Sequence, residues 1–105
     1  MKSKRSKACD IKQSVKERVW ERDGHRCIFC GSTSAMPNAH FVPRSKGGLG
    51  IEQNIVTACI YCHQLMDQGN WWQRHEKQLR AKEYLEEQYP DFPHEKRFYK
   101  NEISS

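Results

Sequence analysis

The spacing of apolar residues near the start of the chain predicts a helix. Val15 and Val19 lie four positions apart, on one helical face, and Asp23-Gly24 is a typical helix stop. Ser14 and Glu17 predict a capping box, because the hydroxyl and the carboxylate can satisfy free backbone N–H groups of the first turn. We therefore expect a short amphipathic helix that packs its valines against the rest of the domain.

The pattern in the middle of the chain predicts strands and then a helix. Residues 39–42 and 55–57 suit two short strands, and the glycine-rich loop 44–50 separates them. A helix should follow from about Cys59 to Gln68, where Gly69 stops it. This order places a loop, two strands and a helix close together in sequence.

A longer helix is predicted in the last third of the chain. Asn70 and Gln73 form a second capping-box pattern, and Pro90 ends the helix near Tyr89. The apolar residues of this helix lie roughly on one stripe, which predicts packing against the core: Trp72, Leu79 and Leu85. A base-stacking role for Trp71 or Trp72 is the less favoured alternative.

Cysteine spacing indicates that this small domain binds a metal. A chain of 105 residues with 36% apolar residues buries only a modest core, so a structural metal would contribute much of its stability. The two Cys-x-x-Cys pairs suit a tetrahedral zinc: Cys27, Cys30, Cys59 and Cys62. The 28 residues between the pairs exceed the usual zinc-ribbon interval of roughly 15–20. We expect the active site inside this insert; disulfides are the alternative, and Cys9 should be a free thiol.

The formal net charge of +5 is concentrated at the N-terminus. Residues 1–26 hold nine Lys or Arg side chains against four Asp or Glu, and the rest of the chain is balanced. We expect residues 1–13 to form a basic flexible arm that binds a polyanion, although a solubilising tail would have the same charge. No apolar stretch suits a signal peptide or a membrane span, and metal-bound thiolates suit a reducing compartment, so a cytoplasmic location without a membrane partner is expected.

Three segments together resemble the HNH endonuclease family. They are RDGHRCIFCG at 22–31, AHFVPRSKGG at 39–48 and NIVTACIYCH at 54–63. The three letters of the family name correspond to His40, Asn54 and His63, and the match spans about residues 18–70. The resemblance implies a small α+β fold: a ββα-metal, treble-clef-like core, stabilised by a zinc on four cysteines, with flanking N- and C-terminal helices. The nuclease domain would span 14–89, with a C-terminal tail at 90–105.

The histidines suit phosphodiester hydrolysis. Imidazole titrates near neutral pH, so His40 can act as the general base, and a buried hydrogen-bonded histidine is the alternative. The resemblance implies that His63 binds a catalytic divalent ion, and Asp67 lies four residues later on the same helical face. Asn54 is expected to tie the loop between the strands through its side-chain amide.

Ala39 departs from the family pattern, because many members have a metal ligand at that position. Either His63 and Asp67 suffice with water and phosphate oxygens, or Asn38 or the His40 backbone contributes, or catalysis is weak. Mg²⁺ tolerates such a shell, and Mn²⁺ or a similar ion suits the histidine. Arg44 and Lys46 are candidate phosphate ligands, unless they only form a charged solvent loop.

The resulting hypothesis is a small stand-alone endonuclease of phage, prophage or restriction type that nicks or cleaves DNA. A homodimer or a phage or restriction partner protein is left open. One alternative is a zinc module that binds nucleic acid without cutting it. Another is an interaction module that displays Trp71 and Trp72 to a protein.

Overall fold

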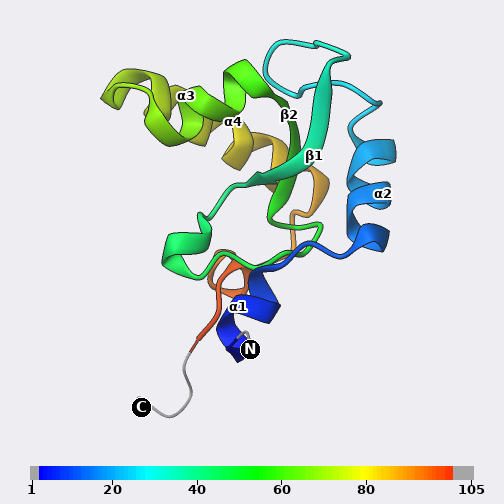
Figure 1. Cartoon of the computed structure of the whole chain (residues 1–105), viewed down its shortest axis with the longest axis vertical. Helices are drawn as coiled ribbons and strands as arrows, with labels where there is room; N and C mark the ends of the chain where they lie inside the picture. The colour runs from blue at the N-terminus through cyan, green and yellow to red at the C-terminus, as the bar shows by residue number, and fades with distance from the viewer. Residues whose placement is uncertain (1–2, 101–105) are drawn as a thin grey trace.

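A two-stranded antiparallel sheet lies between helices (Figure 1). The structure, a computed structural model, describes residues 3–100. Its elements in chain order are α1 (Lys4–Cys9), α2 (Gln13–Arg22), β1 (Ala35–His40), a 3₁₀ turn (Arg44–Lys46), β2 (Ile55–Cys59), α3 (Ile60–Gln68), α4 (Trp71–Gln88) and a second 3₁₀ turn (His94–Arg97). The predicted small α+β class is confirmed.

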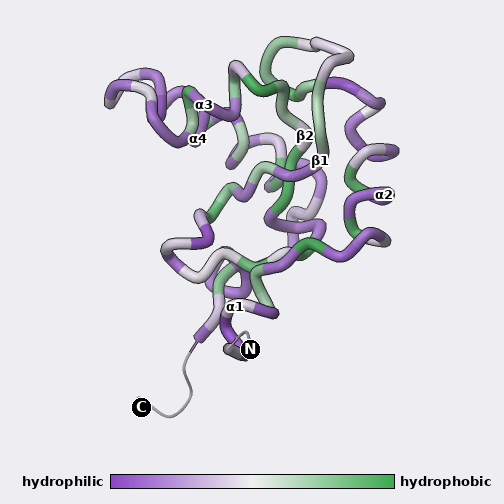
Figure 2. The backbone as a smooth tube through the Cα atoms, viewed as in Figure 1, coloured by the Kyte–Doolittle hydropathy of each residue, from purple (hydrophilic) through white to green (hydrophobic). Residues whose placement is uncertain are grey.

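Strand β2 is the buried centre of the molecule. Every residue of β2 is buried, and apolar positions gather along it while α4 is largely hydrophilic (Figure 2). Ile55 packs with Val15 and Val19 of α2, whereas Val56 belongs to the core shared with α3 and α4. Because successive side chains of a strand point to opposite faces, β2 joins the two apolar clusters.

Strand β1 pairs with β2 from Ala35 opposite Cys59 to His40 opposite Ile55. The register shifts between Met36 and Ala39, and the strand ends at His40. The observed strand therefore begins and ends earlier than the predicted strand at 39–42. Phe41 N–H still donates to the Asn54 carbonyl, but the chain turns into the loop after it. The bulge lies directly before the predicted catalytic histidine.

Helix boundaries agree with the sequence at most points. The Asn70 and Gln73 capping box is present at α4, with both bonds at 2.9 Å, and α4 ends at Gln88. The predicted Ser14 capping box is wrong, because α2 begins at Gln13 and Ser14 is already inside the helix. Lys12 is its N-cap, without a side-chain bond.

The apolar stripe of α4 packs only in part. Leu85 is fully buried, but Trp72 is 72% exposed and Leu79 is 46% exposed. Figure 1 shows the reason: the first half of α4 runs beside α3 away from the sheet, and only its second half reaches the core. The predicted packing of Trp72 is therefore wrong.

The predicted flexible arm at residues 1–13 is also corrected in its described part. Residues 3–13 include α1, and Cys9 is buried rather than held in a flexible segment. Gly50 N–H donates to the Ala8 carbonyl, and a Cβ at Gly50 would lie 2.1 Å from the Asp10 carbonyl oxygen. Packing against a distant loop orders this segment, which its polar composition does not reveal.

The predicted C-terminal tail at 90–105 is structured as far as residue 100. Arg97 is buried and donates to the Gln53 carbonyl at 2.6 Å, while Phe98 forms a β-bridge with Gly48. The segment therefore packs against the loop between β1 and β2. Residues 101–105 lie outside the described part.

A buried ion pair joins α2 to the rest of the domain. Arg22 Nε donates to Asp23 Oδ1 at 2.7 Å, and its terminal nitrogens donate to the carbonyls of Glu52 and Ile55, each at 2.7 Å. Asp23 also accepts from the Thr57 N–H and from the Tyr84 hydroxyl. Burial, reinforced by Asp23, raises the pKa of Tyr84 to about 12.

Replacing Asp23 with alanine should lower the free energy of unfolding by about 3 kcal/mol, because the nearly buried Arg22 charge would lose its partner. Urea denaturation of the metal-loaded protein measures this. Asp91 is exposed, so Asp91→Ala is the matched control and should change stability by less than about 0.5 kcal/mol. Equal stability of the two variants would contradict the role of the ion pair.

Candidate metal centre and active site

Four cysteine sulfurs converge at one point. The Sγ atoms of Cys27, Cys30, Cys59 and Cys62 lie within 4.8 Å of one another, and those of Cys30 and Cys59 are 3.6 Å apart. A tetrahedral zinc with bonds of about 2.3 Å spaces its sulfurs by about 3.8 Å. The cluster therefore has the size and donor chemistry of a structural metal site, such as one for zinc.

Local backbone geometry builds the cluster from two different elements. In the first pair, Gly31 N–H donates to the Cys27 carbonyl, and Gly31 has the left-handed φ of 79° that this turn requires. In the second pair, Cys59 ends β2 and caps α3, with its Sγ accepting from Cys62 N–H. Ile28 N–H donates to the Thr57 carbonyl and so fixes the first pair against β2.

The thiols of the cluster have pKa values shifted in opposite directions. Burial opposes ionisation of Cys27, but backbone N–H groups of Cys59, Cys30 and Phe29 lower its pKa to about 7. Burial and the neighbouring sulfurs raise the pKa of Cys62 well above its usual range. All five cysteines lie in the described part of the chain and none forms a disulfide, so the disulfide alternative is wrong. A bound cation would allow all four sulfurs to ionise together.

His40 lies at the end of β1, half-buried beside α1. Its Nε2 is 2.9 Å from the Cys9 carbonyl oxygen. A carbonyl only accepts, so Nε2 carries the hydrogen, and in the neutral ring the lone pair is on Nδ1. Nδ1 is thus the atom that can take a proton.

Burial lowers the pKa of His40 below its ordinary value of 6.5. The Cys9 carbonyl opposes this shift, Arg44 and His63 add to it, and Asp67 opposes it. His63 and Asp67 are therefore among the groups whose charge acts on the His40 ring. The ring is therefore neutral at physiological pH, as a general base must be.

Asn54 occupies the position that the sequence predicted for it. Its side chain is fully buried; Oδ1 accepts from Val42 N–H at 2.8 Å, and Nδ2 donates to the carbonyls of Val42 and Leu49. Both ends of the loop after His40 are thereby tied to the start of β2. Asn54 is therefore a positioning residue for this loop.

His63 and Asp67 lie on successive turns of α3. Their Nε2 and Oδ2 atoms are 3.3 Å apart, and both side chains are partly exposed. An octahedral ion with bonds of about 2.1 Å spaces adjacent ligands by about 3.0 Å, so one divalent ion can bind both atoms. Within residues 3–100, the cysteine cluster is the one group with three or more such donors, so His63 and Asp67 have no third His, Cys, Asp or Glu beside them.

The surroundings of Ala39 limit which residues could be further ligands of an ion bound by His63 and Asp67. Ala39 is fully buried in the apolar core, so a longer side chain there would have to displace core atoms. Asn38, in contrast, lines a hollow together with His63. The Asn38 amide, one of the donors that the sequence left open, therefore shares a surface with His63.

The two predicted phosphate ligands differ in their surroundings. Arg44 donates to the Cys9 carbonyl at 2.9 Å and pairs with Asp10 at 3.0 Å, so it also fixes the end of α1 beside His40. The side chain of Lys46 is exposed and forms no ion pair with any residue from 3 to 100. The sequence could not predict that the Cys9 carbonyl accepts from His40 and Arg44, because every residue has a backbone carbonyl.

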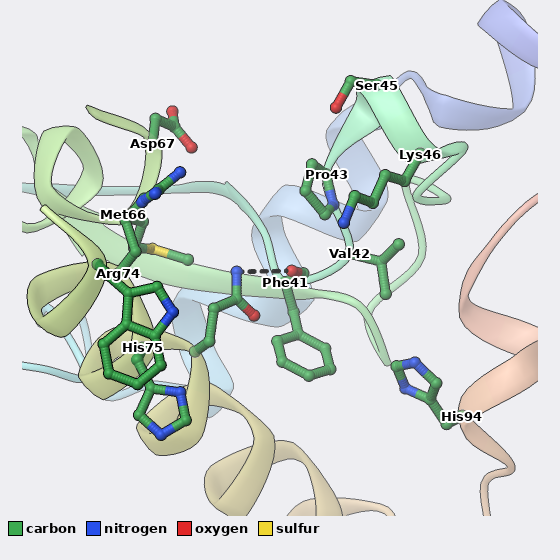
Figure 3. Close-up of a pocket in the computed structure, with 12 residues that line it drawn as sticks. Phe41, Val42, Pro43, Ser45, Lys46, Met66, Asp67, Arg74, His75 and His94 are labelled. Carbon is green, nitrogen blue, oxygen red and sulfur yellow. Dashed lines mark hydrogen bonds between the residues drawn. The ribbon is translucent and has the colours of Figure 1, made fainter. Parts of the chain in front are cut away.

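A groove that is partly lined by Asp67 was not predicted from the sequence. It is lined by the following residues, most of which Figure 3 labels: Phe41, Val42, Pro43, Ser45, Lys46, Met66, Asp67, Trp71, Arg74, His75, Gln78 and His94. Gln78 Nε2 donates to the Phe41 carbonyl at 3.2 Å and joins α4 to the end of β1. The adjacent tryptophans were the available sequence signal for this surface.

Comparison with known proteins gives one partial similarity. The chain is 28% identical over 58 residues to Anaredoxin from Nostoc sp. (strain PCC 7120 / SAG 25.82 / UTEX 2576), across 54% of this chain and 76% of that protein. No protein-family model and no solved structure matches. Among the helices of residues 3–100, none has the length and apolar character needed to cross a membrane.

Proposed function

We propose that this protein is a metal-dependent endonuclease of the HNH type that cleaves phosphodiester bonds in DNA. The observation that carries the proposal is the His40 ring, whose Nε2 is held by the Cys9 carbonyl while Nδ1 remains available, near the His63 and Asp67 pair. The order of two antiparallel strands and a helix, with one histidine on β1 and another on α3, suits a ββα-metal core.

In this mechanism His40 Nδ1 accepts a proton from the attacking water. The new oxygen–phosphorus bond forms as the bond to the 3′ oxygen breaks, which leaves a 5′-phosphate. The Cys9 carbonyl orients the ring and stabilises it once it is protonated, and Asn54 fixes the loop that follows it. Lys46 would position a phosphate oxygen of the substrate.

A divalent ion such as Mg²⁺ or Mn²⁺, when held by His63 and Asp67, would stabilise negative charge on the scissile phosphate and the leaving oxygen. The spacing of these two donors supports such an ion. A single site of this kind cuts one strand per encounter, so nicking is the expected activity. The four-cysteine cluster would hold a structural zinc that fixes the start of α3, directly before His63.

A second candidate is a zinc module that binds nucleic acid without cleaving it. The burial of Ala39 and the presence of only two close side-chain donors within residues 3–100 favour it, because the catalytic ion would be weakly held. The two candidates differ in whether strand scission accompanies binding.

Replacing His40 with alanine should reduce metal-dependent nicking of supercoiled plasmid at least about 100-fold, because the proton acceptor is lost. Nicking is followed on agarose gels with Mg²⁺, Mn²⁺ or EDTA. His25 lies in the turn after α2 and has a left-handed φ of 60° that asparagine tolerates, so His25→Asn is the matched histidine control. Undiminished nicking by a folded His40→Ala protein would exclude the assigned role.

Replacing His63 with alanine, or Asp67 with asparagine, should raise the Mn²⁺ concentration for half-maximal nicking by about tenfold or more, because each change removes one donor. Metal titrations of the nicking rate measure this. The zinc content should stay at the parent's value, since neither side chain is a cysteine of the cluster. An unchanged Mn²⁺ requirement in both variants would place the catalytic ion elsewhere.

Removing the cluster metal with a strong chelator should abolish the cooperative thermal transition, because metal binding at four thiolates is largely folding free energy. Circular dichroism and elemental analysis, before and after zinc is restored, measure fold and metal content together. An unchanged melting curve in protein shown to be metal-free would refute a structural metal. Iron in place of zinc in the purified protein would refute the assigned ion.

A further inference from the structure

Two large aromatic side chains are exposed beside the candidate active site. Trp71 and Trp72 open α4 and are 58% and 72% exposed. Burial of an indole is strongly favourable, so an adjacent pair left in solvent marks an interaction surface. Neither serves the core, which α4 reaches only through its second half.

The indole of Trp71 is held in place rather than free to rotate. Its ring stacks on His75 with centroids 4.9 Å apart and an interplanar angle of 5°, and Trp72 meets it edge-on at 4.7 Å. Asn70 and Gln73 cap the helix at this point and fix its first turn. A fixed, exposed indole is a suitable platform for stacking another planar ring.

The groove next to Trp71 carries positive charge along an apolar floor. Phe41 and Met66 line it, and Figure 3 places Arg74 and Lys46 on opposite sides of Phe41. Both cations are exposed, and neither is in an ion pair with any residue of the described range 3–100. The one acidic residue of the lining is Asp67, which belongs to the candidate ion site.

The exposed indole and the unpaired cations together indicate which ligand the groove would bind. Unpaired cations complement phosphates, and an exposed indole complements a base whose face is free. Bases inside a duplex are covered by their neighbours, whereas the bases of a single strand are not. Because Asp67 lines this groove and contacts His63, a strand bound in the groove would bring its phosphates close to the His63 and Asp67 pair.

We propose that this groove binds an unpaired stretch of DNA, with a base stacked on Trp71 and phosphates beside Lys46 and Arg74. The chain would then prefer single-stranded or frayed substrate over intact duplex. This inference rests on the proposed nuclease function, and it specifies that the DNA bound at the active site is single-stranded.

The test is binding of a fluorescently labelled 12-nucleotide oligothymidylate, measured by anisotropy. It uses zinc-loaded His40→Ala protein without added Mg²⁺ or Mn²⁺, so that cleavage does not interfere. The single strand should bind more tightly than a 12-base-pair duplex. Trp71→Ala should weaken single-strand binding at least about fivefold, the effect of losing one stacked base.

Trp20→Phe is the matched control, because Trp20 is a half-buried indole on α2 that stacks on His25 outside the groove. It should leave the affinity unchanged. Arg74→Gln should weaken binding and lower the slope of log affinity against log salt by about one. Circular dichroism checks that each variant is folded, which is expected since Trp71 and Arg74 are exposed.

Equal affinity of Trp71→Ala and the parent for the oligothymidylate would overturn the inference, as would equal or tighter binding of the duplex. Absence of oligonucleotide binding at ordinary salt would also overturn it and favour a protein partner for the tryptophans. Because binding is measured without cleavage, a chain that binds the strand through Trp71 but never nicks DNA would refute only the nuclease. If the protein nicks DNA but Trp71→Ala binds the oligothymidylate as tightly as the parent, only the proposed role of the groove is refuted.

Discussion

The convergence of four cysteine sulfurs is the constraint on which the rest of the structure depends. It joins a turn after α2 to the junction of β2 and α3, two segments separated by the whole insert that carries His40. A metal held at this junction would fix where α3 begins, and therefore where the side chains of His63 and Asp67 lie. The position of the proposed ion-binding pair, His63 and Asp67, would thus depend on a cluster that has no part in the proposed reaction. In a chain with so small an apolar core, metal binding would supply part of the folding free energy that keeps the site rigid.

His40, the proposed general base, depends on a second set of contacts that comes from outside the motif. The Cys9 carbonyl accepts from both His40 Nε2 and Arg44, while Asn54 closes the loop that begins after His40. The N-terminal segment, the β1 strand and the loop before β2 therefore meet at one imidazole. This arrangement selects the tautomer with a free Nδ1 and shields the ring enough to lower its pKa.

Sequence patterns predicted what depends on local chemistry. The two cysteine pairs and the Asn70 cap follow from residue type and spacing, whereas the Asn54 tie was expected from the family resemblance; each is present in the structure. Other features could not be predicted, because they depend on contacts between segments far apart in the chain. They are the folding of residues 4–9 into α1, the burial of Arg97 and the exposure of Trp72. The Ser14 cap failed for a different reason: the helix starts two residues earlier than that cap predicts, with Lys12 as its N-cap and without a side-chain capping bond. The catalytic assignment rests on resemblance and geometry together, since neither residue spacing nor distance identifies a reaction.

Cleavage of DNA in ¹⁸O-labelled water is the most direct measurement of the central claim, which is hydrolysis by a water that His40 activates. Zinc-loaded protein would be incubated with DNA and Mg²⁺ or Mn²⁺, and the new termini analysed by mass spectrometry. Hydrolysis at the 3′ oxygen predicts one ¹⁸O atom in each new 5′-phosphate. No scission with either metal, or termini without the label, would contradict it.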